Sequence, residues 1–127
     1  MEPLLFGRKR ADDRLGPNLG VIAGNLTPPV GDESAQITPR EMQTIFHEFG
    51  HLIHHLLGEV EAPELNGTRV AWDFVELPSQ IMENWVGEET ALELFAHHYE
   101  TGDVLPKKLL QKIKKSKNFR SGTNCLR

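Results

Sequence analysis

Two histidines and a glutamate stand at the spacing used to bind a metal ion and activate water on it. The segment His47-Glu48-Phe49-Gly50-His51 places two imidazoles four residues apart. On an α-helix both project from one face and can reach a single Zn²⁺ at about 2.0–2.1 Å. Glu48 is rotated about 100° around the helix from His47, so it can reach a metal-bound water without being a ligand. The pattern predicts a zinc hydrolase with His47 and His51 as ligands and Glu48 as general base.

The flanking residues predict the helix that must carry this motif, over residues 38–58. Thr38 can cap its start, Pro39 suits the first helical position and Glu41 completes a capping box. Gly58 is the expected C-terminal stop. The helix has a core face and a histidine face. The apolar half holds Ile45, Phe46, Phe49, Leu52, Ile53, Leu56 and Leu57, and the polar half holds Thr44, His47, Glu48, His51, His54 and His55.

A catalytic zinc keeps three protein ligands and one position for water, so a third ligand must come from elsewhere. A metzincin would need Gly at position 54 and His at position 57; the chain has His54 and Leu57, which excludes that class. The alternative is a carboxylate from a following helix, predicted over residues 71–86. Glu76 on its polar side is the best candidate.

Asp73 and Glu83 share the polar side of this helix and compete with Glu76 for the ligand role. As an alternative, either could accept a hydrogen bond from the second N–H of a ligand histidine. His54 also falls on the histidine face, where a hydrogen-bonded neighbour is favoured over a fourth ligand, since a fourth would close the site to water. Pro78 predicts either a kink in the helix or an irregular first turn.

The other segments predict a mainly helical chain with one or a few short strands. Residues 1–18 look like an irregular lead-in, 19–26 like a β-strand, and 88–127 like C-terminal helices, one ending near Gly102 and one starting at Pro106. The strand could offer an edge to an extended peptide, or be an ordinary sheet strand. The edge positions are Gly20, Val21, Ile22, Ala23 and Gly24.

Composition excludes several classes of function. Fourteen basic against 18 acidic residues give a net charge of −4, which argues against nucleic acid as a partner. The basic run from Lys107 to Arg120 could attract acidic partners, but a solvated helix face is favoured. Leu19 to Leu26 is far below a membrane span of roughly 20 residues, and the first residues lack signal-peptide order. Cys125 is the single cysteine, so no intrachain disulfide can form, and we expect a cytoplasmic protein.

The sequence resembles the thimet oligopeptidase family of zinc metallopeptidases. HEFGHLIH, then Gly67-Thr68, then DFVELPSQIMENW carry the resemblance, and GNLTPPV and HYETGDVLPKKLL are similar to the bacterial oligopeptidase A branch. The resemblance runs from about Leu19 onward and implies Glu76 as third ligand, with one Zn²⁺ per chain. It also implies a zincin-type helical catalytic core within a larger, two-lobed α-helical enzyme, whose deep channel admits short peptides.

One departure from the family limits this expectation. Family members are several times longer, and their tyrosine- and histidine-rich segment, which binds substrate and helps stabilise the oxyanion, lies downstream of the matched region. His97, His98 and Tyr99 are not in that segment, and packing or surface roles are expected for them. We therefore expect a fragment of a zinc metalloendopeptidase that hydrolyses short peptides. The alternatives are a truncated zinc-binding remnant without turnover and a small self-contained protease that would lack oxyanion donors.

Overall fold

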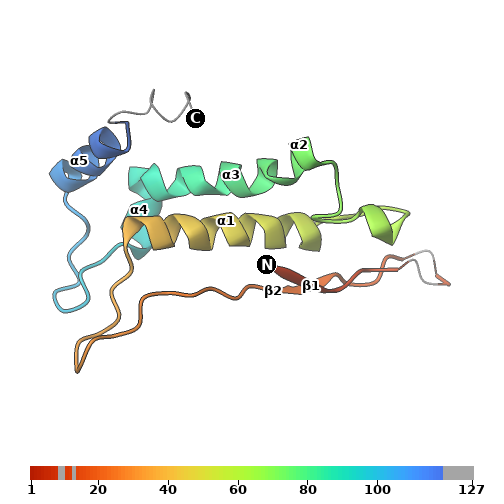
Figure 1. The fold of residues 1–127 in the computed structure, drawn as a ribbon, viewed down its shortest axis with the longest axis horizontal. Coiled ribbons are helices and arrows are strands. Elements are labelled where there is room, and N and C mark those ends of the chain that lie inside the picture. The colour runs from red at the N-terminus through yellow and green to blue at the C-terminus, as the bar shows by residue number, and fades with distance from the viewer. Residues whose placement is uncertain (9–10, 13, 119–127) are drawn as a thin grey trace. The chain divides into compact units, whose positions relative to one another are not determined.

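The computed structural model describes residues 1–8, 11–12 and 14–118, and it confirms the predicted mainly helical class. The chain forms two compact units, a first unit of residues 1–86 and a second unit from residue 87 onward. None of the helices in the described part is long and apolar enough to cross a membrane. The elements (Figure 1) are the strands β1 (Glu2–Leu5) and β2 (Leu19–Val21), the helices α1 (Pro39–Leu56), α2 (Trp72–Val75), α3 (Leu77–Glu83), α4 (Glu89–Phe95) and α5 (Lys107–Asn118), and 3₁₀ turns at Pro63–Leu65 and Asn84–Gly87.

Helix α1 starts at the predicted capping box and ends two residues before the expected glycine. The Thr38 hydroxyl accepts the Glu41 N–H, and the Glu41 carboxylate accepts the Thr38 N–H at 2.8 Å. At the other end, the Asn18 amide donates to the carbonyls of Leu56 at 3.3 Å and Gly58 at 2.9 Å. Because a side chain satisfies these terminal carbonyls, the helix needs no further turn.

The hairpin differs from the predicted irregular lead-in and the predicted strand over 19–26. β1 lies within the lead-in and pairs antiparallel with β2, with Glu2 opposite Val21 and Leu5 opposite Leu19. Charges, glycine and proline along residues 1–18 conceal this strand, since it shows no alternating pattern. β2 ends at Val21 because the pairing ends there, and residues 22–26 have no strand partner among those described.

The helix predicted over 71–86 is interrupted at Glu76. α2 ends at Val75 and α3 begins at Leu77, with Pro78 in the first turn of α3. Proline tolerates that position because the first N–H groups of a helix have no intrahelical acceptor. The interruption therefore falls just before the proline, and Glu76 stands between the two helices. The 3₁₀ turn Asn84–Gly87 takes in the last three residues of the predicted segment.

In the second unit, the helix predicted to run from 88 to 101 is shorter. α4 ends at Phe95 because the next backbone groups pair locally: the His98 N–H donates to the Asp103 carbonyl at 2.8 Å. Gly102, at φ 73°, makes the turn that a side chain would strain. α5 follows at Lys107, with Lys107 paired to Glu89. The predicted features over 119–127, including Cys125, lie outside the described residues.

The interior of the first unit is polar. Its fully buried described side chains are His55, Asn66 and Ser79. The His55 Nε2 lies 3.0 Å from the Leu5 carbonyl and 3.1 Å from the Leu19 carbonyl, so one N–H from α1 serves both strands. This ring binds the hairpin to the helix that carries the histidine pair.

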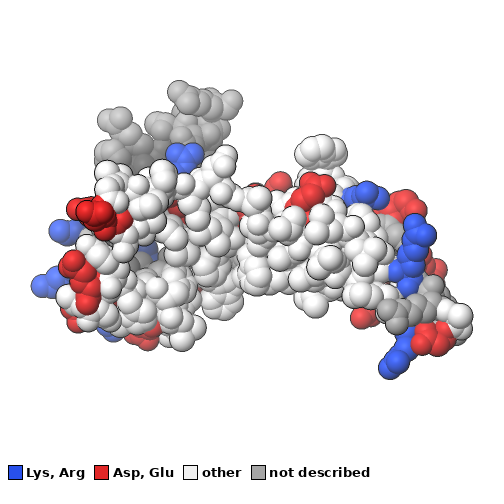
Figure 2. All heavy atoms as spheres, turned by 90° about the horizontal axis from the view of Figure 1, so that it is seen from below, with Lys and Arg blue, Asp and Glu red and all other residues white. Residues whose placement is uncertain are grey.

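Apolar side chains of the first unit remain widely exposed. Trp72 is 92% and Leu57 74% exposed, while the described large hydrophobic residues that are buried, Leu92 and Leu110, both belong to the second unit. Figure 2 shows a face with a broad stretch almost free of charged side chains. Exposed apolar surface of this extent is typical of a site that contacts another molecule.

We predict that the 127-residue chain on its own is marginally stable and binds a hydrophobic dye at neutral pH. The reason is that few large apolar side chains leave water when it folds, so little hydrophobic free energy offsets the loss of chain entropy. Dye fluorescence and a thermal melt followed by circular dichroism test this. A sharp cooperative melt at high temperature without dye binding would contradict it.

Glu41 supplies a second prediction. Hydrogen bonds from the Thr27 hydroxyl, and then from the Thr38 N–H, lower the pKa of Glu41 to about 2 from 4.5. The folded pKa is depressed, so this stabilisation is complete above pH 4.5 and is lost as the pH falls through about 2. NMR titration of the Glu41 carboxyl carbon should give that low midpoint, and Thr27→Val should raise it. Thr44→Val removes a hydroxyl that donates to the Arg40 carbonyl, and it should leave the midpoint unchanged; an equal rise there would refute this assignment.

Candidate metal centre

The two motif histidines converge on the side of α1 that faces α3. The Nε2 atoms of His47 and His51 lie 3.2 Å apart, and their rings meet edge to face with centroids 4.8 Å apart. Both side chains are largely shielded, at 26% and 11% exposure. Four-residue spacing on a regular helix accounts for this pairing.

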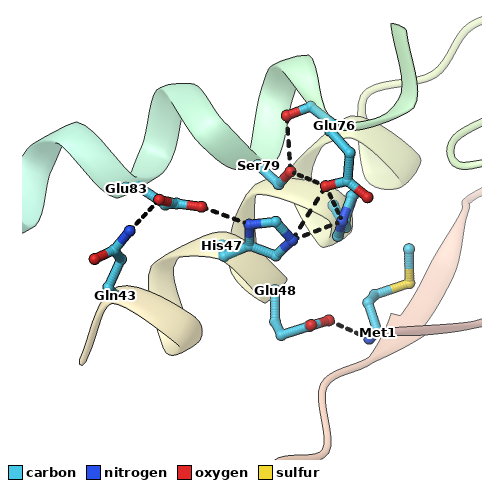
Figure 3. A network of polar contacts seen from close by, with 8 residues as sticks. Met1, Gln43, His47, Glu48, Glu76, Ser79 and Glu83 are labelled. Carbon is cyan, nitrogen blue, oxygen red and sulfur yellow. Dashed lines mark hydrogen bonds and ion pairs between the residues drawn. The ribbon is translucent and has the colours of Figure 1, made fainter. Parts of the chain in front are cut away.

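Glu76 completes a triangle with the two histidines (Figure 3). Its Oε2 atom lies 3.2 Å from the His47 Nε2 and 3.3 Å from the His51 Nε2. These three residues form a group able to hold a metal ion. Ligands about 2.0–2.1 Å from a tetrahedral zinc are about 3.3 Å from one another. The three atoms already have that spacing, and two imidazole nitrogens with one carboxylate oxygen are a donor set that zinc accepts, so the residues fit the ion.

Glu83 fixes the orientation of His47. Its Oε1 accepts a hydrogen bond from the His47 Nδ1 at 2.7 Å, and its other oxygen accepts one from the Gln43 amide. With the proton on Nδ1, the Nε2 lone pair of a neutral ring points into the triangle. Of the two carboxylates expected to compete for this contact, Glu83 makes it. Asp73 is exposed and makes no contact with either histidine in the described structure.

His54 is not part of the triangle. Its ring packs edge-on against Phe74, with centroids 5.9 Å apart, and its buried Nδ1 has no hydrogen-bond partner in the described part of the chain. Burial, followed by repulsion from His51 and His55, lowers the pKa of His54 and favours a neutral ring. The hydrogen bond to a neighbour that its position suggested is therefore absent among the described residues.

Glu48 leaves the helix beside the triangle and turns toward the hairpin. Its Oε2 accepts a hydrogen bond from the Met1 ammonium (Figure 3). That contact lowers the pKa of Glu48 against the opposing effect of burial, and the charges of His51 and His47 lower it further. The side chain is 27% exposed, so water can reach it. The carboxylate is thus ionised at neutral pH and outside the ligand set.

The predicted peptide-binding edge is only partly a strand. Gly20 and Val21 belong to β2, whereas Ile22, Ala23 and Gly24 follow its end. A Cβ at Gly20 would lie 2.7 Å from a Leu52 methyl and 3.3 Å from the His55 ring, so glycine allows β2 to pack closely against α1. β1 occupies one edge of β2.

Comparison with known proteins identifies the family. The model of peptidase family M3 matches residues 5–127. The chain belongs to this family. It is 45% identical to oligopeptidase A of Haemophilus influenzae over 124 residues, which are 96% of this chain and 18% of that protein. It is 43% identical to oligopeptidase A of Escherichia coli over 128 residues, covering the whole chain and 19% of the relative.

A mitochondrial intermediate peptidase also matches. The mitochondrial intermediate peptidase of Botryotinia fuckeliana is 44% identical over 86 residues, 67% of this chain and 11% of that protein. The family resemblance and the preference for the oligopeptidase A branch inferred from the motifs are confirmed. The chain spans about a fifth of the length of the oligopeptidases A that it matches.

Two residues beside the triangle were not predicted from the sequence. Gln43 donates to Glu83, and Ser79 donates to Glu76 at 2.9 Å. Ser79 stands three residues after Glu76, a spacing that brings side chains together on a helix and could have signalled the contact. Gln43 stands four residues before His47, a spacing that also places two side chains on the same side of a helix.

The contact between Glu83 and His47 predicts that Glu83→Gln weakens zinc binding by about 10- to 100-fold, the usual effect of removing a partner of a ligand histidine. Asp73→Asn is the matched control, because it removes a carboxylate from the same segment without touching His47. Competition with a chromophoric chelator measures both affinities. Equal losses of zinc affinity in the two variants would mean that the affinity depends on net negative charge and not on the contact with His47.

Proposed function

We propose that this chain carries the zinc-binding and water-activating part of an M3 metalloendopeptidase that hydrolyses short peptides. The observation that carries the proposal is the triangle of His47 Nε2, His51 Nε2 and Glu76 Oε2, with edges of 3.2 to 3.3 Å. The names of the relatives, oligopeptidase A among them, support a peptide substrate. One zinc ion per chain would be held by these three side chains.

The proposed reaction divides its tasks between the ion and the protein. A bound zinc would supply an activated water and polarise the scissile carbonyl. Glu48 accepts the proton of the attacking water and then donates it to the leaving amine. Its ionised state suits the first step.

The other proposed roles concern orientation. Glu83, held by Gln43, keeps the proton of His47 on Nδ1, so that Nε2 remains a ligand. The segment from Gly20 to Gly24 would align an extended peptide by strand pairing. A cytoplasmic location belongs to the proposal and rests on the cysteine usage and on a relative named probable cytosolic oligopeptidase A.

A second candidate function is a zinc-binding remnant without turnover. Under the first proposal, further polypeptide supplies the groups that stabilise the oxyanion and covers the exposed apolar surface. Peptide hydrolysis that a chelator abolishes would separate the two candidates.

We predict that Glu48→Gln, made in the full-length peptidase, retains zinc and loses about 10²- to 10⁴-fold in kcat, as loss of a general base typically does. Glutamine keeps the shape and can hydrogen-bond to water, but it cannot accept the proton. Zinc stays because none of the three ligands changes. Elemental analysis gives the metal content, and a short quenched peptide gives kcat.

Both measurements are needed to interpret this variant. Loss of zinc in Glu48→Gln would show that the carboxylate is structural. Wild-type kcat with full zinc would remove Glu48 from the mechanism. Glu93→Gln, which neutralises an exposed carboxylate in α4 outside the triangle, is the control and should change neither value.

A further inference from the structure

Ser79 makes a contact that the proposed mechanism does not use. Its side chain is fully buried, and its Oγ lies 2.9 Å from both the Glu76 backbone carbonyl and the Glu76 Oε2. The Oε2 atom is the same one that faces the Nε2 atoms of His47 and His51 (Figure 3). The Ser79 hydroxyl therefore lies against Glu76 Oε2, the one atom of the triangle that does not come from α1.

We propose that Ser79 is a positioning residue for the metal centre. Its hydroxyl holds the Glu76 oxygen beside the histidine nitrogens, and Gly50 sets how close Ser79 lies to α1. This inference rests on the proposed function, because it takes Glu76 as the third ligand. It adds two positions to the site, one in the middle of the histidine motif and one in α3.

Glu76 needs such support because little else restrains it. Its side chain is 48% exposed and leaves the backbone between two short helices. A glutamate has three rotatable side-chain bonds, and an exposed one loses conformational entropy when it is fixed. The Ser79 hydroxyl donates toward Oε2, so it occupies one lone pair of that oxygen and leaves the other for the triangle. The hydroxyl has one proton, which the Glu76 Oε2 and the Glu76 carbonyl share, and the carbonyl contact ties the hydroxyl to the backbone.

Gly50 determines how near Ser79 comes to α1. A Cβ at Gly50 would lie 2.6 Å from the Ser79 Cα, 2.8 Å from the Pro78 carbonyl oxygen and 3.0 Å from the Ser79 nitrogen. These are backbone atoms, so no side-chain rotation can relieve the overlap. Any larger residue moves α3 away from α1, and Ser79 and Glu76 move with it. The glycine thus fixes the distance between the third ligand and the other two.

Zinc affinity of the full chain tests the proposal, measured by competition with a chromophoric chelator. Ser79→Ala keeps a good helix former and removes only the hydroxyl; affinity should fall about 10- to 100-fold. The absorption spectrum of bound Co²⁺ should change, because the carboxylate is no longer held. Gly50→Ala should lower the affinity further, although alanine favours the helix itself. Thr44→Ala removes a hydroxyl that donates to the Arg40 carbonyl, and it should leave affinity and spectrum unchanged.

Glu76→Gln separates this inference from the proposed function. If Glu76→Gln loses zinc while Ser79→Ala binds it normally, the role of Ser79 is refuted and the ligand set stands. If Glu76→Gln binds zinc like the unsubstituted chain, the ligand set itself is wrong. A fall in helical content in Ser79→Ala, seen by circular dichroism, would assign Ser79 to the folding of α3 and overturn the inference.

Discussion

The backbone of α1 at Gly50 lies against the backbone of α3 at Ser79, and the arrangement of the first unit follows from that contact. Two helices normally stand about 8–10 Å apart, separated by side chains. Here a glycine removes the side chain on one helix, and a buried serine presents a small one on the other. This close approach allows the Glu76 side chain, just before α3, to reach the two imidazoles on α1.

A polar interior accompanies this packing. The first unit is held by directed bonds rather than by a large apolar core: His55 binds two strand carbonyls, and the Asn66 amide donates to Asn18 at 2.9 Å. Gly67, at φ 60°, closes over the His55 ring, where a Cβ would lie 2.9 Å from Nδ1. Directed bonds fix angles as well as distances, which suits a region that must keep ligand atoms within tenths of an ångström.

The sequence predicted the features that depend on local spacing. His47 and His51 lie on the same side of α1 because a helix repeats every 3.6 residues. Thr38 and Glu41 mark the helix start because they are only three residues apart and hydrogen-bond to each other. Pro78 indicated that the helix predicted over 71–86 is irregular, but it did not show that the break falls at Glu76. β1 escaped prediction because strand pairing is a tertiary event, and α4 stops early because backbone groups around Gly102 pair with one another. The closeness of Ser79 to Gly50 was missed because the two residues are 29 positions apart in sequence but adjacent in space.

The bond between His55 and the two strand carbonyls has a consequence for the order in which the chain is made. The ring follows the Leu5 carbonyl by 50 residues and the Leu19 carbonyl by 36. During synthesis at about 5–20 residues per second, the hairpin leaves the ribosome seconds before the helix that secures it. In that interval its unpaired strand edge can join a neighbouring nascent chain instead. The hairpin therefore spends that interval without the two His55 contacts that attach it to α1.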